Sequence, residues 1–320
     1  MSLVQIDHLC RSFGGVHAVR DLSLNFDAGQ IMGFIGPNGA GKSTSMRILA
    51  TLDLPSAGDC RVAGLSTVDD ADAVRRLIGF MPDGGEPYPH MTVWEYLDFF
   101  ARAYDLGPVK GRQAVEGVMD FCQLDGISGK LASTLSKGMR QRLSLGRCLI
   151  HDPQVLILDE PSAGLDPRAR IEFRDLLKAL TARGKAVLIS SHILSELDEL
   201  CDRVAIIEQG RLVAHGTVED VKSQARQARD VAPGPDRQRL VDLRLAEDRD
   251  DWERTLAEQP GVRIERCDRR SATVRLEGGD ADQARLAKAL IDRGLPLCHC
   301  AARADGLEDV FMHLTDGAVQ

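Results

Sequence analysis

Three short runs of consecutive apolar residues mark the first part of the chain: Ile31–Ile35, Val155–Leu158 and Val187–Ile189. Runs of this length, without polar alternation, are typical of strands in a parallel sheet that helices cover on both faces. Helical patterns stand between these runs, and two of them, Val93–Tyr104 and Leu143–Ile150, predict a helical unit beside the sheet. The first two thirds of the chain therefore predict an α/β fold, with a domain over residues 1–222.

The last part of the chain has a different pattern. A polar stretch that contains Pro233-Gly234-Pro235 predicts a linker over residues 223–239. The segments that follow are expected to alternate as strand, helix, strand, strand, helix and strand, over Leu240–Ala246, Asp250–Gln259, Val262–Cys267, Ala272–Glu277, Gln283–Arg293 and Leu295–Cys300. This order predicts a small ferredoxin-like α+β domain over residues 240–320.

Composition and charge narrow the class of protein. The 320 residues include 40 Lys and Arg against 48 Asp and Glu, a formal net charge of −8, which argues against nucleic acid as a partner. No apolar run reaches the roughly 18 residues of a membrane span, and the N-terminus lacks the pattern of a signal peptide. Eight scattered cysteines fit a reducing cytoplasm better than a disulfide scaffold. Cys298-His299-Cys300 has no second ligand pair at zinc-site spacing.

A phosphate-binding loop is the first candidate for chemistry. The pattern G-x-x-x-x-G-K-[ST] is matched by Gly36, Pro37, Asn38, Gly39, Ala40, Gly41, Lys42 and Ser43, and Thr44 follows. A buried strand precedes it and a helical pattern follows it, as this motif requires. The glycines let successive N–H groups point at phosphate oxygens, and the helix N-terminus adds partial positive charge. Lys42 would contact the β- and γ-phosphates and Ser43 would bind Mg²⁺, so the predicted ligands are ATP and Mg²⁺.

Two acidic residues end the second apolar run. Asp159 and Glu160 follow Val155–Leu158 directly. Acids at the end of a buried strand are costly unless they meet a cation, although two acids facing solvent remain the plainer alternative. With a phosphate loop upstream, Asp159 is expected to hold Mg²⁺ and Glu160 to act as the base that polarises the attacking water.

Further motifs follow in a fixed order. Leu135-Ser136-Lys137-Gly138-Met139 precedes the acidic pair, Ser162-Ala163-Gly164-Leu165-Asp166 follows it, and His192 ends the third apolar run. Over about residues 3–220 this order resembles the nucleotide-binding subunit of ABC transporters. The tail at Leu307–Phe311 resembles the C-terminal extension of a subgroup that serves multidrug, antibiotic and polysaccharide exporters.

The resemblance implies a head-to-tail dimer, or a heterodimer with a similar subunit, with two ATP molecules sandwiched at its interface. Ser136 and Gly138 of one subunit would cap the γ-phosphate bound by the other, unless Ser136 merely caps an ordinary helix. His192 would contact the γ-phosphate and the attacking water. Asp166 would couple the two sites. Phe13 would stack on adenine, the alternative being a buried residue at a strand end.

Two departures from the family pattern concern the site. Lys137 and Met139 replace a Gly and the Gln of the usual signature, whereas Ser136 and Gly138 remain. After Phe80-Met81-Pro82 the family usually has a Gln that reaches the metal, and this chain has Asp83. Its carboxylate makes Asp83 a further candidate ligand for Mg²⁺.

Aromatic residues gather in one segment. Seven of the 14 aromatics lie between residues 80 and 104, including all three tyrosines: Phe80, Tyr88, Trp94, Tyr96, Phe99, Phe100 and Tyr104. Tyr and Trp favour protein interfaces, although the rings could equally fill the helical unit. In the resembled family this region receives a helix of a separate transmembrane permease, so we expect the permease to dock near Tyr88–Tyr104.

The motifs together predict an ATPase that powers an exporter from the inner face of the membrane, held there by its permease. The small C-terminal domain has no phosphate loop, so we expect it to regulate the protein or support the dimer. One alternative is an ATPase of the same superfamily that acts on nucleic acid or the ribosome. Such proteins usually carry a long coiled coil or a second cassette, which this chain lacks. The other is an ATP switch that does not hydrolyse, for which Glu160 would be unnecessary.

Overall fold

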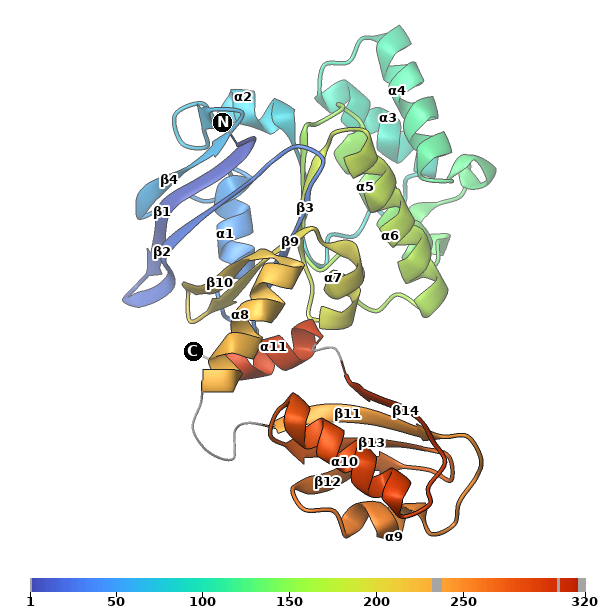
Figure 1. Ribbon diagram of the computed structural model, residues 1–320. Coiled ribbons are helices and arrows are strands. Elements are labelled where there is room, and N and C mark those ends of the chain that lie inside the picture. The colour runs from blue at the N-terminus through green and yellow to red at the C-terminus, as the bar shows by residue number, and fades with distance from the viewer. Residues whose placement is uncertain (1, 232–237, 304–305, 316–320) are drawn as a thin grey trace. The chain divides into compact units, whose positions relative to one another are not determined.

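The computed structural model describes residues 2–231, 238–303 and 306–315. The chain divides into two compact units (Figure 1). The first contains Met1–Val221 together with the last segment from Leu307, and the second contains Lys222–Gly306. None of the helices in the described ranges is long and apolar enough to cross a bilayer.

A six-stranded sheet forms the centre of the first unit. Its order is β10 (Arg211–Thr217), β9 (Arg203–Glu208), β3 (Ile31–Ile35), β8 (Ala186–Ser190), β7 (Val155–Leu158) and β6 (Ile78–Met81). All neighbours run parallel except the β9–β10 hairpin. Every residue of β3, β7 and β8 is buried, as expected for parallel strands with both faces covered. The predicted α/β fold is confirmed.

A second, antiparallel sheet packs against the first. It has the order β2 (Val16–Phe26), β1 (Val4–Phe13), β4 (Ala57–Val62) and β5 (Leu65–Ser66). Helix α1 (Lys42–Leu49) contributes Met46, Ile48 and Leu49 to one apolar core that includes residues of both sheets. The helix that begins at the phosphate loop is therefore held on both sides, which fixes its N-terminus.

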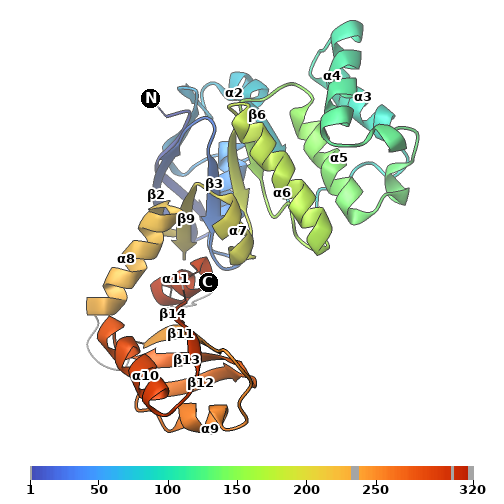
Figure 2. The same ribbon diagram turned by 45° about the vertical axis from the view of Figure 1, so that its right-hand side comes forward.

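Helices surround the large sheet and form a bundle beside it (Figures 1 and 2). The bundle contains α3 (Val93–Ala103), α4 (Pro108–Phe121) and α5 (Lys137–Leu149), which pack on one another. Thr92 begins α3 with a capping box, in which Thr92 and Glu95 satisfy each other's backbone N–H groups. The remaining helices are α2 (Ala71–Leu77), α6 (Pro167–Ala182) and α7 (Leu194–Leu200). The helical unit expected from Val93–Tyr104 and Leu143–Ile150 is confirmed.

The second unit has the strand order of a ferredoxin-like domain. The sheet runs β12 (Val262–Cys267), β13 (Ser271–Glu277), β11 (Gln238–Leu245) and β14 (Leu297–Ala302), with antiparallel neighbours throughout. Helices α9 (Trp252–Ala257) and α10 (Asp280–Asp292) cover one face of the sheet (Figure 2). Trp252 and Leu290 are fully buried there, in a core of the unit's own.

The boundaries differ from the prediction at both ends of this unit. Helix α8 (Val218–Val231) continues through the first half of the expected linker. The stretch is polar overall, but its Gln, Ala and Arg residues are good helix formers. The tail from Leu307, expected as part of the C-terminal domain, forms helix α11 (Leu307–Leu314), which packs against α7 in the first unit. Residues 232–237, including Pro233-Gly234-Pro235, lie outside the described residues.

The packing of α11 on α7 leads to a testable expectation. Val310 is 1% exposed, whereas Met312, on the same helix, is 74% exposed. Val310→Asp buries an unpaired carboxylate, which commonly costs several kcal/mol. We therefore expect thermal unfolding of Val310→Asp at a clearly lower temperature, with ATP hydrolysis reduced because α7 begins just after His192. Met312→Asp is the control. Equal melting temperatures for the two variants would show that α11 does not support the first unit.

Candidate functional site

The phosphate loop lies between the end of β3 and the start of α1. Two of its glycines have no room for a side chain: a Cβ at Gly36 would collide with the carbonyl oxygen of Ile207, and one at Gly41 with that of Ala18. Gly41 also has a φ of 102°, a conformation that side-chain-bearing residues rarely adopt. The loop is therefore wedged between neighbouring strands in one conformation, with its backbone free to approach a ligand.

Lys42 is held over this loop. Its side chain is 7% exposed, and Nζ donates to the carbonyl oxygens of Gly36 at 2.7 Å and Pro37 at 3.0 Å. Burial lowers the pKa of the Lys42 ammonium, against the opposing attraction of Glu160 and then Asp159. Ser43, in the first turn of α1, is exposed and Thr44 is half-buried. A glycine cradle, a buried ammonium and an exposed hydroxyl at a helix N-terminus together fit a nucleoside triphosphate.

The acidic pair follows β7 as the sequence predicts. Asp159 is 5% exposed, and the Ser190 hydroxyl at the end of β8 donates to its Oδ1 at 2.6 Å. The same hydroxyl oxygen accepts from the backbone N–H of Glu160 at 2.9 Å. Ser190 thus connects the two strand ends and fixes the direction of both acids. It was not predicted, although its place just before His192 on a buried strand was a signal.

Glu160 has an unusual backbone. Its φ of 49° lies in the left-handed region, which typically costs a non-glycine residue on the order of 1 kcal/mol or more. Such strain tends to persist where surrounding structure holds a residue for function. The Ser190 contact to the Glu160 N–H is one such restraint.

His192 and Glu160, both predicted as catalytic residues, are in direct contact. His192 Nδ1 lies 2.7 Å from Glu160 Oε2. The Glu160 side chain is 17% exposed and the His192 side chain 62%. A carboxylate this enclosed, with one oxygen held by the imidazole, keeps its other oxygen for a water molecule. The arrangement can therefore position and deprotonate a nucleophilic water.

Ser136 and Asp166 both begin helices. Ser136 caps α5 by accepting from the N–H of Met139, and Asp166 caps α6 by accepting from that of Ala169 at 3.0 Å. A Cβ at Gly138 would lie 3.2 Å from the Ala169 Cβ, so the two helix N-termini pack closely. Ser136 remains exposed. Ser136 and Asp166 therefore both act as helix caps. The surface around the two helix N-termini could in addition contact a ligand or a second subunit.

Phe13 ends β1 in an exposed position. Its exposed fraction is 45%, so the alternative of a buried strand-end residue is wrong. The Arg11 guanidinium lies 4.3 Å from the ring centroid, a cation–π contact that covers part of the ring. Phe13 thus has an accessible aromatic surface, as stacking on a base requires.

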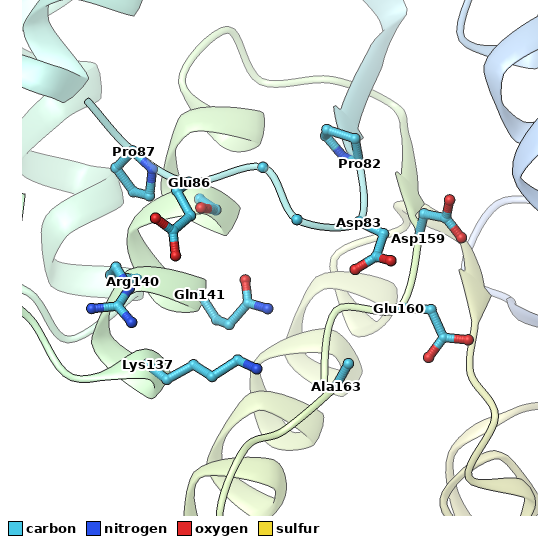
Figure 3. A pocket seen from close by; sticks show the side chains of 13 residues that line it. Pro82, Asp83, Glu86, Pro87, Lys137, Arg140, Gln141, Asp159, Glu160 and Ala163 are labelled. Carbon is cyan, nitrogen blue, oxygen red and sulfur yellow. The ribbon is translucent and has the colours of Figure 1, made fainter. Parts of the chain in front are cut away.

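A cavity of about 200 Å³ lies beside the acidic pair (Figure 3). Asp83, Asp159 and Glu160 line one side, and Lys137, Arg140 and Gln141 from α5 line another. The Lys137 ammonium lies over Gly164, next to the loop that follows Glu160. Among the described residues, no group of three or more His, Cys, Asp and Glu side chains could hold a metal ion by itself. Asp83 therefore shares the cavity without completing a protein-only metal site.

The aromatic segment forms a second surface. Tyr96 is 4% exposed, in contact with Tyr88 and Phe100, whereas Tyr88 is half exposed. A cavity of about 270 Å³ lies next to these rings, lined by Leu52, Ile78, Phe80, Phe100, Tyr104 and Arg147. Some rings thus pack in the core of the bundle and others line a cavity at its edge, next to β6 and the segment that follows α1.

This sheet carries a phosphate loop, an acidic pair and a histidine in contact with the second acid, beside a helix that begins at the predicted signature. Together these features define an ATP-binding cassette, and comparison with known proteins agrees. The family model described as ABC transporter matches residues 19–163. Nod factor export ATP-binding protein I of Paraburkholderia xenovorans (strain LB400) is 38% identical over 213 residues, covering 67% of this chain and 70% of that protein. The chain belongs to the ABC transporter family, as an ATP-binding subunit that hydrolyses ATP to drive transport.

Two further relatives extend the comparison. The daunorubicin/doxorubicin resistance ATP-binding protein DrrA of Streptomyces peucetius is 34% identical over 314 residues, covering 98% of this chain and 92% of that protein. This match includes the second unit. The solved structure of cbiO1 from Clostridium perfringens, described as part of the ABC transporter complex cbiONQ, has a TM-score of 0.64 and 26% identity. It covers 72% of this chain and 96% of that one.

Proposed function

We propose that this subunit binds Mg-ATP at a head-to-tail dimer interface and drives a separate membrane permease that exports its substrate. Two relatives named for Nod factor export and for drug resistance support the direction of transport. The observation that carries hydrolysis is the contact between Glu160 and His192, beside a phosphate loop that holds a buried lysine. The site of action is the cytoplasmic face of the membrane.

Each residue has a defined task in this proposal. Lys42 neutralises charge on the β- and γ-phosphates, while the hydroxyl of Ser43 and the carboxylate of Asp159 hold Mg²⁺, directly or through water. The metal supplies charge neutralisation on the phosphates when bound. Glu160 accepts the proton of the attacking water, and His192 keeps the carboxylate in place. Asp83, on the same side of the cavity as Asp159 and Glu160, would reach the same metal.

The dimer would complete each site. The N-termini of α5 and α6 lie together at the surface, so Ser136 and Gly138 can present backbone N–H groups to a phosphate bound by the second subunit. Asp166 begins α6 next to them and would couple the two sites. Phe13 would stack on the adenine. The second subunit would be either a second copy of this chain or a similar chain that is expressed with it.

The cavity of about 270 Å³ next to the aromatic segment is the proposed docking site for the permease. Its walls combine the exposed Leu52 and the half-buried Phe80 and Phe100 with Tyr104 and Arg147, a composition that favours a protein partner. The cavity also reaches Phe80 at the end of β6, just before Asp83. A helix seated there would thus lie close to the loop that lines the catalytic cavity.

A single substitution tests this docking site and with it the proposed function. Leu52 is 53% exposed and lines the cavity, whereas Leu54 is 62% exposed and does not. We expect Leu52→Glu to keep ATP binding and basal hydrolysis while its recovery with membranes containing the co-expressed permease falls about tenfold, as at a binding hot spot. Leu54→Glu is the matched control. Unchanged recovery and transport in Leu52→Glu would rule out this cavity as the docking site.

A further inference from the structure

The sheet of the second unit has one face without helices. Helices α9 and α10 cover the other face (Figure 2). A cavity of about 360 Å³ lies on the open face and extends across all four strands. The charged residues that line it are Asp242, Arg244, Arg266, Asp268 and His299. No step of ATP binding or hydrolysis involves these residues.

Among the described residues, the basic side chains of this cavity are not held by a direct contact, although the Asp268 carboxylate attracts the Arg266 guanidinium. Arg244, Arg266 and His299 are exposed, and within the described part of the chain their side chains form no hydrogen bond or ion pair. Other arginines of the unit are paired, as Arg239 is with Asp280 and Arg249 with Asp251. Two arginines without an ion pair among the described residues, Arg244 and Arg266, therefore lie where the sheet is hollowed.

The strand register places these groups side by side. Arg244 on β11 lies directly opposite His299 on β14. Two groups that can both carry positive charge are unfavourable as direct cross-strand neighbours. Arg266 is the partner of Thr273, which is in turn the partner of Asp242. An anion between the basic groups would remove this repulsion.

The acids of the cavity are already engaged. The Asp268 carboxylate accepts hydrogen bonds from the Ser271 hydroxyl and from the N–H groups of Arg270 and Ser271. These bonds lower the pKa of Asp268 to about 2. Asp242 Oδ1 accepts from the Thr273 hydroxyl at 2.7 Å. Both acids thus accept hydrogen bonds within the sheet, and the guanidinium groups of the arginines remain available to a ligand.

We propose that this cavity binds a small ligand that carries at least two anionic groups, phosphate or carboxylate. Arginine forks bind both groups in a bidentate manner. Arg244 on β11 and Arg266 on β12 are separated by two strand spacings, roughly 10 Å, so each can bind a different anionic group of one small ligand. Single-stranded nucleic acid is disfavoured because β11 to β14 contain no Phe, Tyr or Trp on which a base could stack.

Calorimetric titration of the full-length protein tests the proposal. The phosphate loop is first saturated with a non-hydrolysable ATP analogue and Mg²⁺. The heat of adding pyrophosphate or citrate to the same solution without protein is subtracted, because both probes also chelate Mg²⁺. We expect one equivalent of probe to bind, with an affinity that falls as salt increases because the cavity is open to solvent. Arg244→Ala/Arg266→Ala should weaken it at least about tenfold, the loss expected for charge-assisted hydrogen bonds.

The matched control is Arg263→Ala/Arg303→Ala, which removes two exposed arginines of the same unit, one on β12 and one just after β14, that do not line the cavity. This control should bind like the parent protein. Equal weakening in both double variants would mean diffuse attraction to a basic surface and would overturn the site. Absence of binding by either probe, or binding of an acidic peptide alone, would overturn a small-ligand site. Thermal unfolding of each variant confirms that it is folded.

Discussion

Glu160→Gln is expected to bind ATP like the parent and to hydrolyse it about 100-fold to 10,000-fold more slowly, the usual contribution of a general base. The amide keeps the shape of the side chain, and its oxygen can still accept from a His192 N–H, so the backbone strain and the His192 contact remain. What is lost is the ability to take up a proton from water. Phosphate release measures the rate, and fluorescent-nucleotide titration measures the affinity.

The same variant tests the proposed dimer. If hydrolysis opens the ATP-bound dimer, Glu160→Gln should elute as a dimer in Mg-ATP on size exclusion, whereas the parent protein returns to monomer. Glu86→Gln is the matched control, because Glu86 lines the same cavity but does not follow β7. Hydrolysis at the parent rate in Glu160→Gln would show that another group is the base. If the variant is slow but stays monomeric, the assignment of Glu160 as the base stands and the head-to-tail dimer is contradicted.

The fold could be predicted from the sequence wherever strands are buried on both faces. Ile31–Ile35 and Val155–Leu158 are continuous apolar runs, and they are strands with those bounds. The antiparallel sheet was not predicted, because its strands alternate and β1 changes register several times along its pairing with β2. Such a strand has no unbroken periodicity to recognise.

The second unit shows the opposite case. Strand β13 alternates regularly, and β12 was predicted with the bounds it has although its pairing shifts register between Ile264 and Arg266. The strand order follows the ferredoxin-like topology. The tail from Leu307 was placed in the C-terminal domain because it follows that domain in the sequence, whereas the structure buries Leu307 and Val310 in the first unit. Tertiary packing against α7 decides that question, and α7 is more than a hundred residues away in sequence.

The candidate site divides along similar lines. Motif residues such as Lys42, Asp159 and Glu160 were found because local spacing fixes their geometry. Ser190 was missed, since a serine at a strand end is common, and only the parallel pairing of β7 with β8 brings its hydroxyl to both acids. Lys137 illustrates a side chain whose direction the sequence leaves open, and the structure places its ammonium over Gly164.

Lys42→Ala is expected to weaken ATP binding about tenfold to a hundredfold. A charge-assisted contact of this kind commonly contributes about 1.5–3 kcal/mol, and each 1.4 kcal/mol corresponds to about a factor of ten in the dissociation constant. In the free protein the ammonium is buried against two carbonyl oxygens, and burial lowers its pKa. Its desolvation cost is therefore already present before ATP binds, so little of the energy of its contact with phosphate is lost to desolvation on binding.

This burial separates binding from folding in the experiment. Lys42→Met fills similar space without charge, so its thermal unfolding without nucleotide should match or exceed that of the parent, while ATP binding is weakened as in Lys42→Ala. Lys110→Ala, an exposed lysine on α4, is the control for loss of one positive charge. An unchanged dissociation constant for ATP in Lys42→Met would show that the ammonium does not contact the phosphates. Weaker binding together with a lower melting temperature would instead show that Lys42 acts by holding the loop through the Gly36 and Pro37 carbonyl groups.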